Sequence, residues 1–200
     1  MTFSAGSQRA QNQQNPTILI VGGVSGSGKT TVGAMLAGRL HWPFADADDF
    51  HPAANIEKMR SGIPLTDEDR QPWLRAIAAW MDERIAGDES AVMTCSALKR
   101  SYRDALLGGR PGVRMVFLAP DREVLAKRLA ARQGHFFSGQ LLGTQLDALE
   151  PPQPDENVIT FNPVGNPADT VASIIAVLWP DEDAGAGASG AAGGDHEAEA

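Results

Sequence analysis

The chain of 200 residues is 42% hydrophobic, which suits one α/β domain and is short for two domains of ordinary size. Its net charge of −8 is unevenly spread, because residues 181–200 contain six acidic side chains and no Lys or Arg, which leaves −2 on the rest. A nearly neutral body lacks the basic bias of a nucleic-acid-binding surface, so we expect no nucleic-acid partner. No apolar run approaches the ~20 residues of a membrane span, and no secretory signal pattern begins the chain. With a single cysteine, these features favour a cytoplasmic protein that has no membrane partner.

Composition divides the chain into three segments. Residues 1–15 are rich in Gln, and residues 181–200 are rich in Ala, Gly and acidic side chains, so neither segment has much to bury. We therefore expect both ends to be disordered and residues 16–180 to form the folded domain.

The first predicted elements are a strand and a helix joined by a glycine-rich loop. The apolar run 17–21 predicts a buried strand. One apolar face at i, i+3, i+4 and i+8 predicts a helix from Lys29 to about Leu40, formed by Val32, Met35, Leu36 and Leu40. Residues 23–30 between them match G-x-x-x-x-G-K-[ST] at every fixed position. A flexible glycine turn without a ligand is the alternative, and the strand before the loop and the helix after it disfavour that alternative.

This loop, called the P-loop below (residues 23–30), predicts the binding of a nucleoside triphosphate. Its glycines allow the backbone to curl around an anion, and the helix that follows offers its positive end to the same phosphates. Lys29 adds a mobile charge, and Thr30 supplies a hydroxyl to the Mg²⁺ ion that accompanies the phosphates. The residues expected to bind ATP are Gly23, Val24, Ser25, Gly26, Ser27, Gly28, Lys29, Thr30 and Thr31.

Strand-like and helix-like segments alternate along the rest of the chain, which is the pattern of a parallel sheet covered on both faces. Further strands are predicted at 42–45, 91–95, 113–118 and 158–161. Helices are predicted at about 52–62, 66–81, 98–107, 122–132 and 171–178, and a capping box at 66–69 marks the start of the second of these. Pro72 predicts a kink or a restart within the helix that begins at the capping box. The fold class is therefore α/β, a single P-loop NTPase domain with a five-stranded parallel sheet, helices on both faces and a mobile lid segment.

Two acidic residues follow the second predicted strand, at the edge where α/β sheets present their ligands. Alternate residues of an extended segment face the same side, so Asp46 and Asp48 can point together, one toward Mg²⁺ and one toward the group that accepts the phosphoryl. A solvated acidic turn with Asp49 as a helix cap is the alternative.

Two groups of cations are candidates for contacts with anions. Lys99, Arg100 and Arg103 begin a predicted helix, where cations oppose the helix dipole unless an anionic ligand is present, and solvated surface charge is the alternative. Arg128 and Arg132 share a helical face beside Gly134 and His135, which suits a mobile lid that closes over phosphates. His135 by itself is more typical of a packed or capping histidine.

The remaining nucleophiles and metal ligands carry weaker signals. Cys95 lies in an apolar run, which favours a buried thiol over a nucleophile. The four histidines show no zinc-ligand spacing, and Cys95 has no partner thiol.

Five motifs, taken in chain order, resemble those of the bacterial gluconokinases, and the resemblance spans about residues 18–178. The motifs are residues 23–31; Asp46-Ala47-Asp48 with His51-Pro52 and residues 55–59; residues 67–74; residues 95–99 with Tyr102-Arg103-Asp104; and Gly134-His135-Phe136-Phe137. The resemblance implies phosphorylation of the 6-hydroxyl of D-gluconate by ATP with Mg²⁺, on a fold similar to shikimate and adenylate kinases. It also implies a homodimer.

The same resemblance implies roles for single residues. Asp48 would contact the acceptor hydroxyl, as the candidate base, and Asp46 would contact the magnesium shell together with Thr30. Gluconate would be held by Arg70, Lys99 and Arg103, with His51, Lys58 and His135 as further candidates. Catalysis would use Lys29, Asp48, Arg128 and Arg132, the two arginines acting as lid cations toward the phosphates. One departure from the family pattern is Asp49, which stands where many relatives have an apolar residue.

Three other functions compete with this interpretation. A regulatory GTPase should carry N-K-x-D and D-x-x-G, and neither stands in a suitable place. A kinase for another small metabolite remains open, because a few pocket contacts decide the acceptor. An inactive ATP-binding regulator is disfavoured, because Lys29, Thr30, Asp48 and both lid arginines are present.

Overall fold

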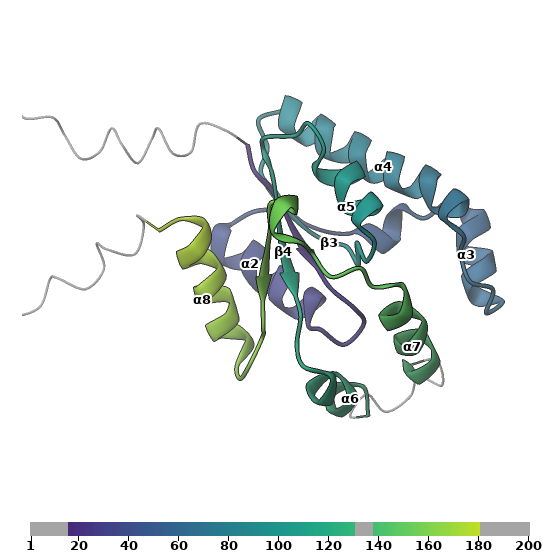
Figure 1. Cartoon of the computed structure of the whole chain (residues 1–200). Coiled ribbons are helices and arrows are strands. Elements are labelled where there is room, and N and C mark those ends of the chain that lie inside the picture. The colour runs from purple at the N-terminus through teal and green to yellow at the C-terminus, as the bar shows by residue number, and fades with distance from the viewer. Residues whose placement is uncertain (1–15, 131–137, 181–200) are drawn as a thin grey trace, which may run out of the picture.

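The computed structural model describes residues 16–130 and 138–180, and its centre is a parallel sheet in the strand order β2-β3-β1-β4-β5 (Figure 1). The strands are β1 (Ile18–Gly22), β2 (Phe44–Asp46), β3 (Ala91–Thr94), β4 (Val113–Leu118) and β5 (Val158–Phe161). All paired neighbours run parallel, so the carboxyl ends of the strands meet at one edge. The five-stranded parallel sheet expected from the sequence is confirmed.

The helices connect these strands in the order expected for crossover connections. They are α2 (Lys29–Leu40), α3 (Ala53–Arg60), α4 (Asp67–Ala86), α5 (Arg100–Leu107), α6 (Arg122–Ala130), α7 (Ser138–Ala148) and α8 (Pro167–Leu178), with the short 3-10 helices η1 (Ala47–Phe50) and η2 (Pro154–Glu156). In the part of the chain that the structure describes, no helix is both long and apolar enough to cross a membrane.

Alternate side chains of β1 build the cores on the two faces of the sheet. Ile18 and Ile20 pack with the buried side chains of α4 and α5, whereas Leu19 and Val21 pack with those of α2 and α8. All four are fully buried, as the period of two in a strand covered on both faces requires. Figure 1 shows the same layers, with α2 and α8 on one side and α4 and α5 on the other. Helices therefore cover both faces, as predicted.

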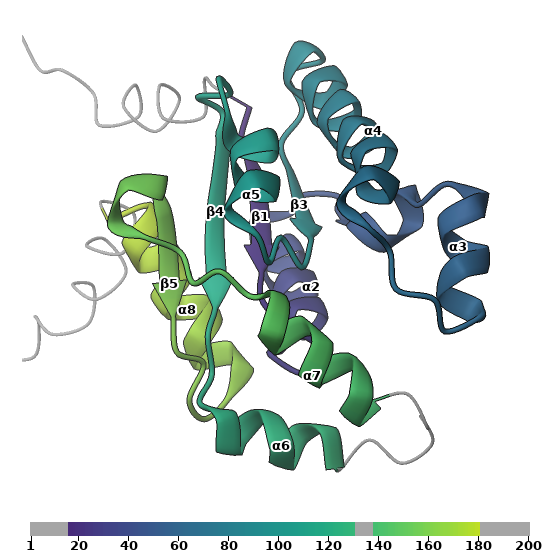
Figure 2. The same cartoon turned by 45° about the vertical axis from the view of Figure 1, so that its right-hand side comes forward.

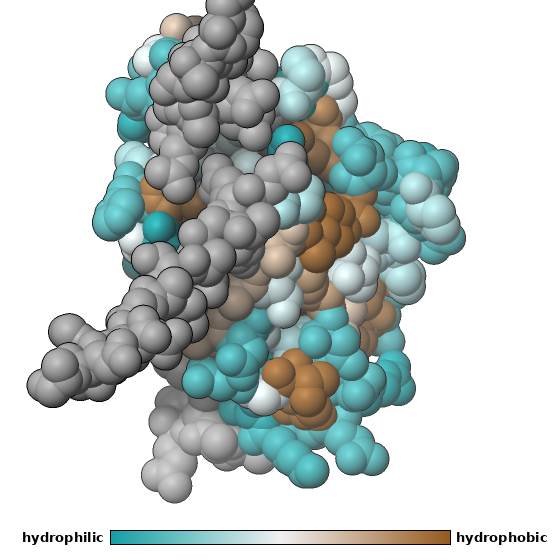
Figure 3. Space-filling view, turned by 90° about the vertical axis from the view of Figure 1, so that its left-hand side faces the viewer, coloured by the Kyte–Doolittle hydropathy of each residue, from teal (hydrophilic) through white to brown (hydrophobic). Residues whose placement is uncertain are grey.

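The side on which α8 lies carries several hydrophobic patches among hydrophilic ones (Figure 3). The exposed large hydrophobic residues of the described chain include Met35 on α2, Phe44 on β2 and Val177 on α8. Met35 was expected on the buried face of its helix, but it is 38% exposed, whereas Val32 and Leu36 on the same helix are buried.

Several element boundaries differ from those predicted. The capping box at the start of α4 is present, with the Thr66 hydroxyl accepting the Asp69 N–H and the Asp69 carboxylate accepting the Thr66 N–H. Pro72 lies inside α4, which continues from Asp67 to Ala86 without a restart. The fourth predicted helix begins at Arg100 instead of residue 98, because Lys99 has an extended backbone and serves as its N-cap.

The α6 and α7 helices lie beyond the carboxyl ends of the strands, away from the two layers that cover the sheet (Figure 2). α7 was not predicted from the sequence. The segment that joins the two helices, residues 131–137, lies outside the described residues. The mobility expected of this lid stays a prediction, as does the division into a folded domain at 16–180 and disordered ends.

Candidate active site

The P-loop is built from glycines with backbone angles that other residues rarely adopt. Gly23, Gly26 and Gly28 have φ values of 134°, 82° and 102°. A Cβ atom on Gly23 would lie 2.6 Å from the carbonyl oxygen of Leu118 and 2.7 Å from Oγ of Ser27. The loop therefore lies tightly against the end of β4, and it leads directly into the N-terminus of α2, where phosphate oxygens bind.

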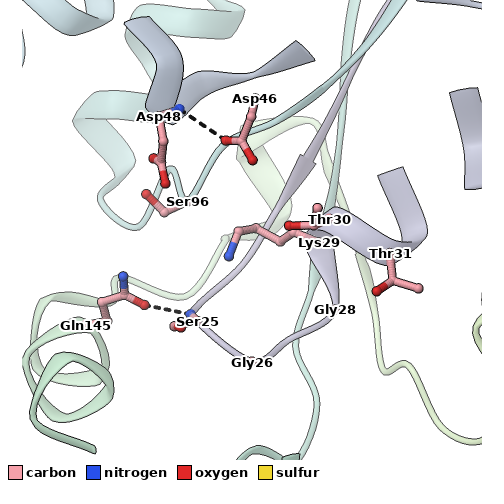
Figure 4. Close-up of a pocket in the computed structure, with 10 residues that line it drawn as sticks. All are labelled: Ser25, Gly26, Gly28, Lys29, Thr30, Thr31, Asp46, Asp48, Ser96 and Gln145. Atoms are coloured by element: carbon pink, nitrogen blue, oxygen red, sulfur yellow. Dashed lines mark hydrogen bonds between the residues drawn. The ribbon is translucent and has the colours of Figure 1, made fainter. Parts of the chain in front are cut away.

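A cleft opens in front of the P-loop (Figure 4). Its lining combines the loop and the start of α2 with the last residue of β2, residues that follow β2 and β3, and one residue of α7: Ser25, Gly26, Gly28, Lys29, Thr30, Thr31, Asp46, Asp48, Ser96 and Gln145. We call it the phosphate cleft. Nζ of Lys29 donates a hydrogen bond to the carbonyl oxygen of Val24 at 3.0 Å. The structure thus brings together the loop lysine, the Thr30 hydroxyl and the two carboxylates that the sequence indicated.

The two carboxylates of the phosphate cleft are held in a fixed relation. Asp46 is the N-cap of η1, and its Oδ1 accepts the backbone N–H of Asp48 at 3.1 Å. Burial in the cleft raises the pKa of Asp48, the negative charges of Asp46 and then Asp49 raise it further, and Lys29 opposes the shift. Asp48 therefore binds a proton more strongly than an ordinary Asp side chain does. That property suits a group that accepts a proton from a hydroxyl.

Trp73 of α4 holds the segment that carries Asp48. Its indole Nε1 donates a hydrogen bond to the carbonyl oxygen of Ala47 at 2.7 Å. The ring of His51 stacks on Trp73 with centroids 4.7 Å apart, and Nδ1 of His51 lies 3.3 Å from the side-chain amide of Asn55. Burial, followed by the charge of Arg70, lowers the pKa of His51, so this ring is neutral at pH 7.

A second cleft lies on the other side of the P-loop. It shares Gly26, Gly28 and Thr31 with the phosphate cleft, and the rest of its lining is Ser27, Val32, Arg128, Pro163, Gly165, Pro167 and Thr170. We call it the nucleoside cleft. Arg128 of α6 bridges its two walls, because Nη1 donates to the carbonyl oxygen of Ser27 at 2.9 Å and Nη2 to that of Pro163 at 3.1 Å. Arg128 thus lines the nucleoside cleft, and it is absent from the lining of the phosphate cleft.

The cations expected to bind the acceptor lie near Tyr102 of α5. The guanidinium of Arg70 lies 5.8 Å and Nζ of Lys99 lies 5.7 Å from the centre of the Tyr102 ring. Nζ of Lys99 lies 2.7 Å from both carboxylate oxygens of Asp67, and the Tyr102 hydroxyl donates a hydrogen bond to the same carboxylate. Nη1 of Arg70 donates to the carbonyl oxygen of Leu65 at 2.6 Å. Arg70, Lys99 and His51 therefore share one region, next to the segment that carries Asp48.

Two other expected contacts lie in structural roles. Nζ of Lys58 lies 2.6 Å from Oδ1 of Asp69, the capping residue of α4. Arg103 is fully buried and forms a bidentate salt bridge with Glu156. Nε lies 2.5 Å from Oε2, and Nη2 lies 2.9 Å from Oε1. Its Nη1 donates to the carbonyl oxygens of Ala97 and Leu98. Arg103 thus joins α5 to η2, and it does not line the phosphate cleft.

Carboxylates of the chain itself balance the cations at the start of α5. Besides the pairs of Lys99 and Arg103, Arg100 pairs with Asp155 at 2.9 Å, and its backbone N–H donates to the Glu150 carboxylate at 2.6 Å. An anionic ligand is therefore not needed to resolve the conflict with the helix dipole. Sequence reasoning missed these partners because they are distant in the chain.

Two residues of the phosphate cleft were also missed. Ser96 follows β3, and Gln145 belongs to α7, where its Oε1 accepts the backbone N–H of Ser25 at 2.6 Å. The available signal was the spacing of Leu142, Leu146 and Leu149, at i, i+4 and i+7, which predicts a helical face. Arg132 and His135 lie outside the described residues, so their predicted positions in a lid stay predictions.

Cys95 is a buried thiol, as expected. Burial raises its pKa to about 12, so it is not a nucleophile at neutral pH. Across residues 16–130 and 138–180, no group of three or more His, Cys, Asp or Glu side chains could hold a metal ion by itself.

A parallel sheet, a P-loop between β1 and α2, and carboxylates facing the loop lysine across a cleft define a P-loop kinase of the small-molecule class. Comparison with known proteins agrees, because residues 18–152 match the family described as "AAA domain". The gluconokinase of Gluconobacter oxydans is 46% identical over 160 residues, 80% of this chain and 90% of that one. The chain belongs to the gluconokinase family.

Solved structures show the same relationship. A gluconokinase from Sinorhizobium meliloti superposes with a TM-score of 0.71 at 44% identity, over 82% of this chain and 93% of that one. A shikimate kinase from Bacteroides thetaiotaomicron superposes with a TM-score of 0.59 at 20% identity, over 81% of this chain and 98% of that one, which shows a common fold. The fold implied by the resemblance in sequence is confirmed.

Proposed function

We propose that the protein transfers the γ-phosphoryl group of ATP to the 6-hydroxyl of D-gluconate, giving 6-phosphogluconate and ADP. The observation that carries the proposal is the phosphate cleft, in which Lys29 and Thr30 face Asp46 and Asp48, in a chain 46% identical to a gluconokinase. A loop that grips phosphates and a carboxylate with a raised pKa across from it are the parts that phosphoryl transfer to an alcohol requires.

ATP lies across both clefts in this proposal. The triphosphate follows the P-loop over Gly26 and Gly28, which line both clefts, and Lys29 contacts the β- and γ-phosphates. The nucleoside occupies the nucleoside cleft beside Pro163 and Gly165. Arg128 is the lid cation that contacts ATP from this side, and Arg132 of the undescribed segment is proposed as its companion.

The residues present fit a magnesium ion. Mg²⁺ prefers oxygen ligands and is usually held by one or two carboxylates together with substrate phosphates and water. The Thr30 hydroxyl and the Asp46 carboxylate both line the phosphate cleft and supply such oxygens. When bound, the ion neutralises charge on the phosphate oxygens. The hydrogen bond that Asp46 accepts from the Asp48 N–H fixes its carboxylate for this contact.

Asp48 acts on the acceptor. Its carboxylate accepts a hydrogen bond from the 6-hydroxyl of gluconate and takes the proton as the hydroxyl oxygen bonds to the γ-phosphorus. The bond between that phosphorus and the oxygen of ADP breaks in the same step, and the released charge stays on ADP beside Lys29.

The carboxylate and hydroxyls of gluconate are proposed to bind Arg70 and Lys99, with the neutral His51 as a hydrogen-bonding partner and His135 of the undescribed segment as a further one. Arg70 and His51 are close enough for the arginine to lower the pKa of the histidine. Arg103 and Lys58, which pair with Glu156 and Asp69, are proposed to support this region rather than touch gluconate.

The proposal is tested with purified protein, ATP, Mg²⁺ and a panel of sugar acids and polyols, with ADP release as the measurement. We expect D-gluconate to give the highest kcat/KM and omission of Mg²⁺ to abolish turnover. Higher kcat/KM with a different acceptor would assign another substrate, and absence of turnover with every acceptor would refute a kinase function.

We propose further that the protein is a homodimer in the cytoplasm, as the family resemblance implies. Analytical ultracentrifugation at several concentrations tests the assembly, because a dimer has twice the 21.2 kDa mass of the chain. A single species of the monomer mass at all concentrations would refute it.

A further inference from the structure

The side chain of Gln145 accepts a hydrogen bond from one of the backbone N–H groups with which the P-loop can bind a phosphate. Its Oε1 accepts the backbone N–H of Ser25 at 2.6 Å, and both residues line the phosphate cleft with Asp48 and Ser96 (Figure 4). An N–H donor must face an oxygen, so this contact determines which way the amide is turned. The Nε2 group, which carries two donor hydrogens, therefore points away from Ser25, as Figure 4 shows.

Contacts of the residues that follow Gln145 hold its part of the chain in place. Leu146 of α7 and Leu149, which follows this helix, pack in one cluster with Val24 of the P-loop and with Leu98. The backbone N–H of Glu150 donates to the carbonyl oxygen of Leu98 at 3.0 Å. A side chain fixed by its neighbours in this way can act as a preorganised donor.

The position of Ser25 identifies the part of ATP that Gln145 would meet. Gly26, Gly28 and Thr31 line both clefts, but Ser25 lines the phosphate cleft alone, together with Lys29, Asp46 and Asp48. In the function proposed above, the triphosphate runs from the nucleoside cleft toward the phosphate cleft, which places its γ-phosphoryl group at the Ser25 end of the loop. Gln145 is therefore beside the group that is transferred, and it comes from a different element than the loop and Asp48.

We propose that Gln145 is a further catalytic residue of the phosphoryl transfer, an inference that rests on the function proposed above. Its Oε1 continues to accept the hydrogen bond from the Ser25 N–H. Its Nε2 donates a hydrogen bond to an oxygen of the γ-phosphoryl group while that group moves to the acceptor. The contact strengthens as charge spreads over the phosphoryl oxygens, so it lowers the barrier more than it strengthens the binding of ATP.

Two substitutions separate the donor from the acceptor of this amide. Gln145→Glu keeps an oxygen for the Ser25 N–H but removes the donor, and Gln145→Ala removes both. We expect kcat with gluconate to fall about 100-fold in both variants, the usual loss when one preorganised donor is removed. The Kd for ATP, measured without gluconate, should change less than about threefold in Gln145→Ala. Asp147→Asn, an exposed change on the same helix, is the control and should leave kcat unchanged.

Each result has a defined meaning. An active Gln145→Glu beside an inactive Gln145→Ala would show that only the contact to Ser25 matters, which would overturn the proposal. Near-normal kcat in both variants would overturn it as well, and so would a loss confined to the Kd for ATP or a fall in kcat that follows a lower melting temperature. If the wild-type protein does not phosphorylate gluconate, the proposed function fails first, which distinguishes the two failures.

Discussion

Arg103 and Glu156 form a two-pronged ion pair in which the two side chains are 0% and 1% exposed. The residues are 53 positions apart, and the pair joins the first turn of α5 to η2, just before β5. Lys99, which precedes α5, pairs with Asp67 of α4, so α5 links the region proposed for gluconate to the segment that follows α7. This pair therefore supports the site from within the core.

Breaking the pair should destabilise the protein, because a buried charge that has lost its partner costs about 3–5 kcal/mol. At about 2–4 °C per kcal/mol for a domain of this size, Arg103→Met should lower Tm by roughly 10 °C. The double variant Arg103→Met/Glu156→Leu should recover most of that loss, since no charge is left unpaired. Thermal unfolding checks both. If Arg103→Met instead kept its Tm and raised the KM for gluconate, the arginine would be a substrate contact.

The same pair predicts how stability depends on pH. The hydrogen bonds from Arg103 lower the pKa of Glu156, so the native state stabilises the charged carboxylate. This contribution is present above the pKa of the unfolded chain and is lost as pH falls through the folded pKa. Unfolding free energies of wild type and Glu156→Gln should therefore differ most at neutral pH and converge in acid. A difference that grew in acid would contradict the assignment.

The titration of Asp48 should determine how the reaction rate falls at acidic pH. Burial in the cleft and the charge of Asp46 raise its pKa, so the rate with gluconate should fall as pH drops through this raised value. Asp49→Asn removes a weaker contribution to the same shift, and should move this fall in rate to lower pH with little effect on kcat at neutral pH. Rate profiles of the two proteins provide the measurement, and coincident profiles would refute the coupling.

Asp48→Asn should lower kcat by roughly 100-fold or more while the Kd for ATP stays within a few-fold, since a base acts in the chemical step. A raised pKa means that the native state disfavours the charged form, so stability falls as pH rises through it. At neutral pH Asp48→Asn should therefore raise Tm. A loss of ATP binding without a loss of kcat would remove Asp48 from the acceptor site.

Substitution by Ala should weaken ATP binding at a glycine of the P-loop and should stabilise the protein at a glycine of α2. Gly23→Ala places a Cβ atom 2.6 Å from the Leu118 carbonyl oxygen at a φ of 134°, so the loop must move and ATP affinity should fall at least about tenfold. Gly38 of α2 has no atom within 4 Å of such a Cβ, so Gly38→Ala should stabilise the helix by about 1 kcal/mol and leave ATP binding unchanged. Calorimetric titration with ATP checks the pair, and equal affinities in the two variants would contradict the account.

Arg70 and Lys58 provide a test of the region proposed for gluconate. Arg70→Met should raise the KM for gluconate about tenfold or more without changing the KM for ATP, because it removes a charge-assisted contact to the acceptor. Lys58→Met should leave both KM values unchanged, since this lysine pairs with the capping Asp69. The pair is partly exposed to solvent, so its loss should cost only about 1 kcal/mol of stability. A higher KM for gluconate in Lys58→Met, with an unchanged KM in Arg70→Met, would instead make Lys58 the contact to gluconate.

Local patterns in the sequence were sufficient for much of the fold. The P-loop follows from its motif, and α2 from Lys29 to Leu40 and the strands β4 and β5 follow from apolar runs and periodicity. The side chains of β4 are mostly buried, and those of β5 are partly buried. The strand order does not follow from these patterns, because it depends on pairing between strands distant in the chain. The family resemblance supplied what periodicity could not, namely the acceptor.

The site was predictable where its residues adjoin a motif. Lys29, Thr30, Asp46 and Asp48 line one cleft as expected. Arg103 was expected at the substrate because the family resemblance implied that role. Its partner Glu156 is distant in the chain and meets it only after the chain has folded. Gln145 carries no charge, and its importance comes from the loop N–H that it meets.

The most direct test of the central claim is the analysis by phosphorus NMR of the product formed from ATP, Mg²⁺ and D-gluconate by the full chain and by its Lys29→Ala variant. The account predicts one phosphate ester, on oxygen 6 of gluconate, and a rate for the variant that is lower by about 100-fold or more. Phosphate on another oxygen, no ester at all, or near-normal formation of the ester by Lys29→Ala would contradict it.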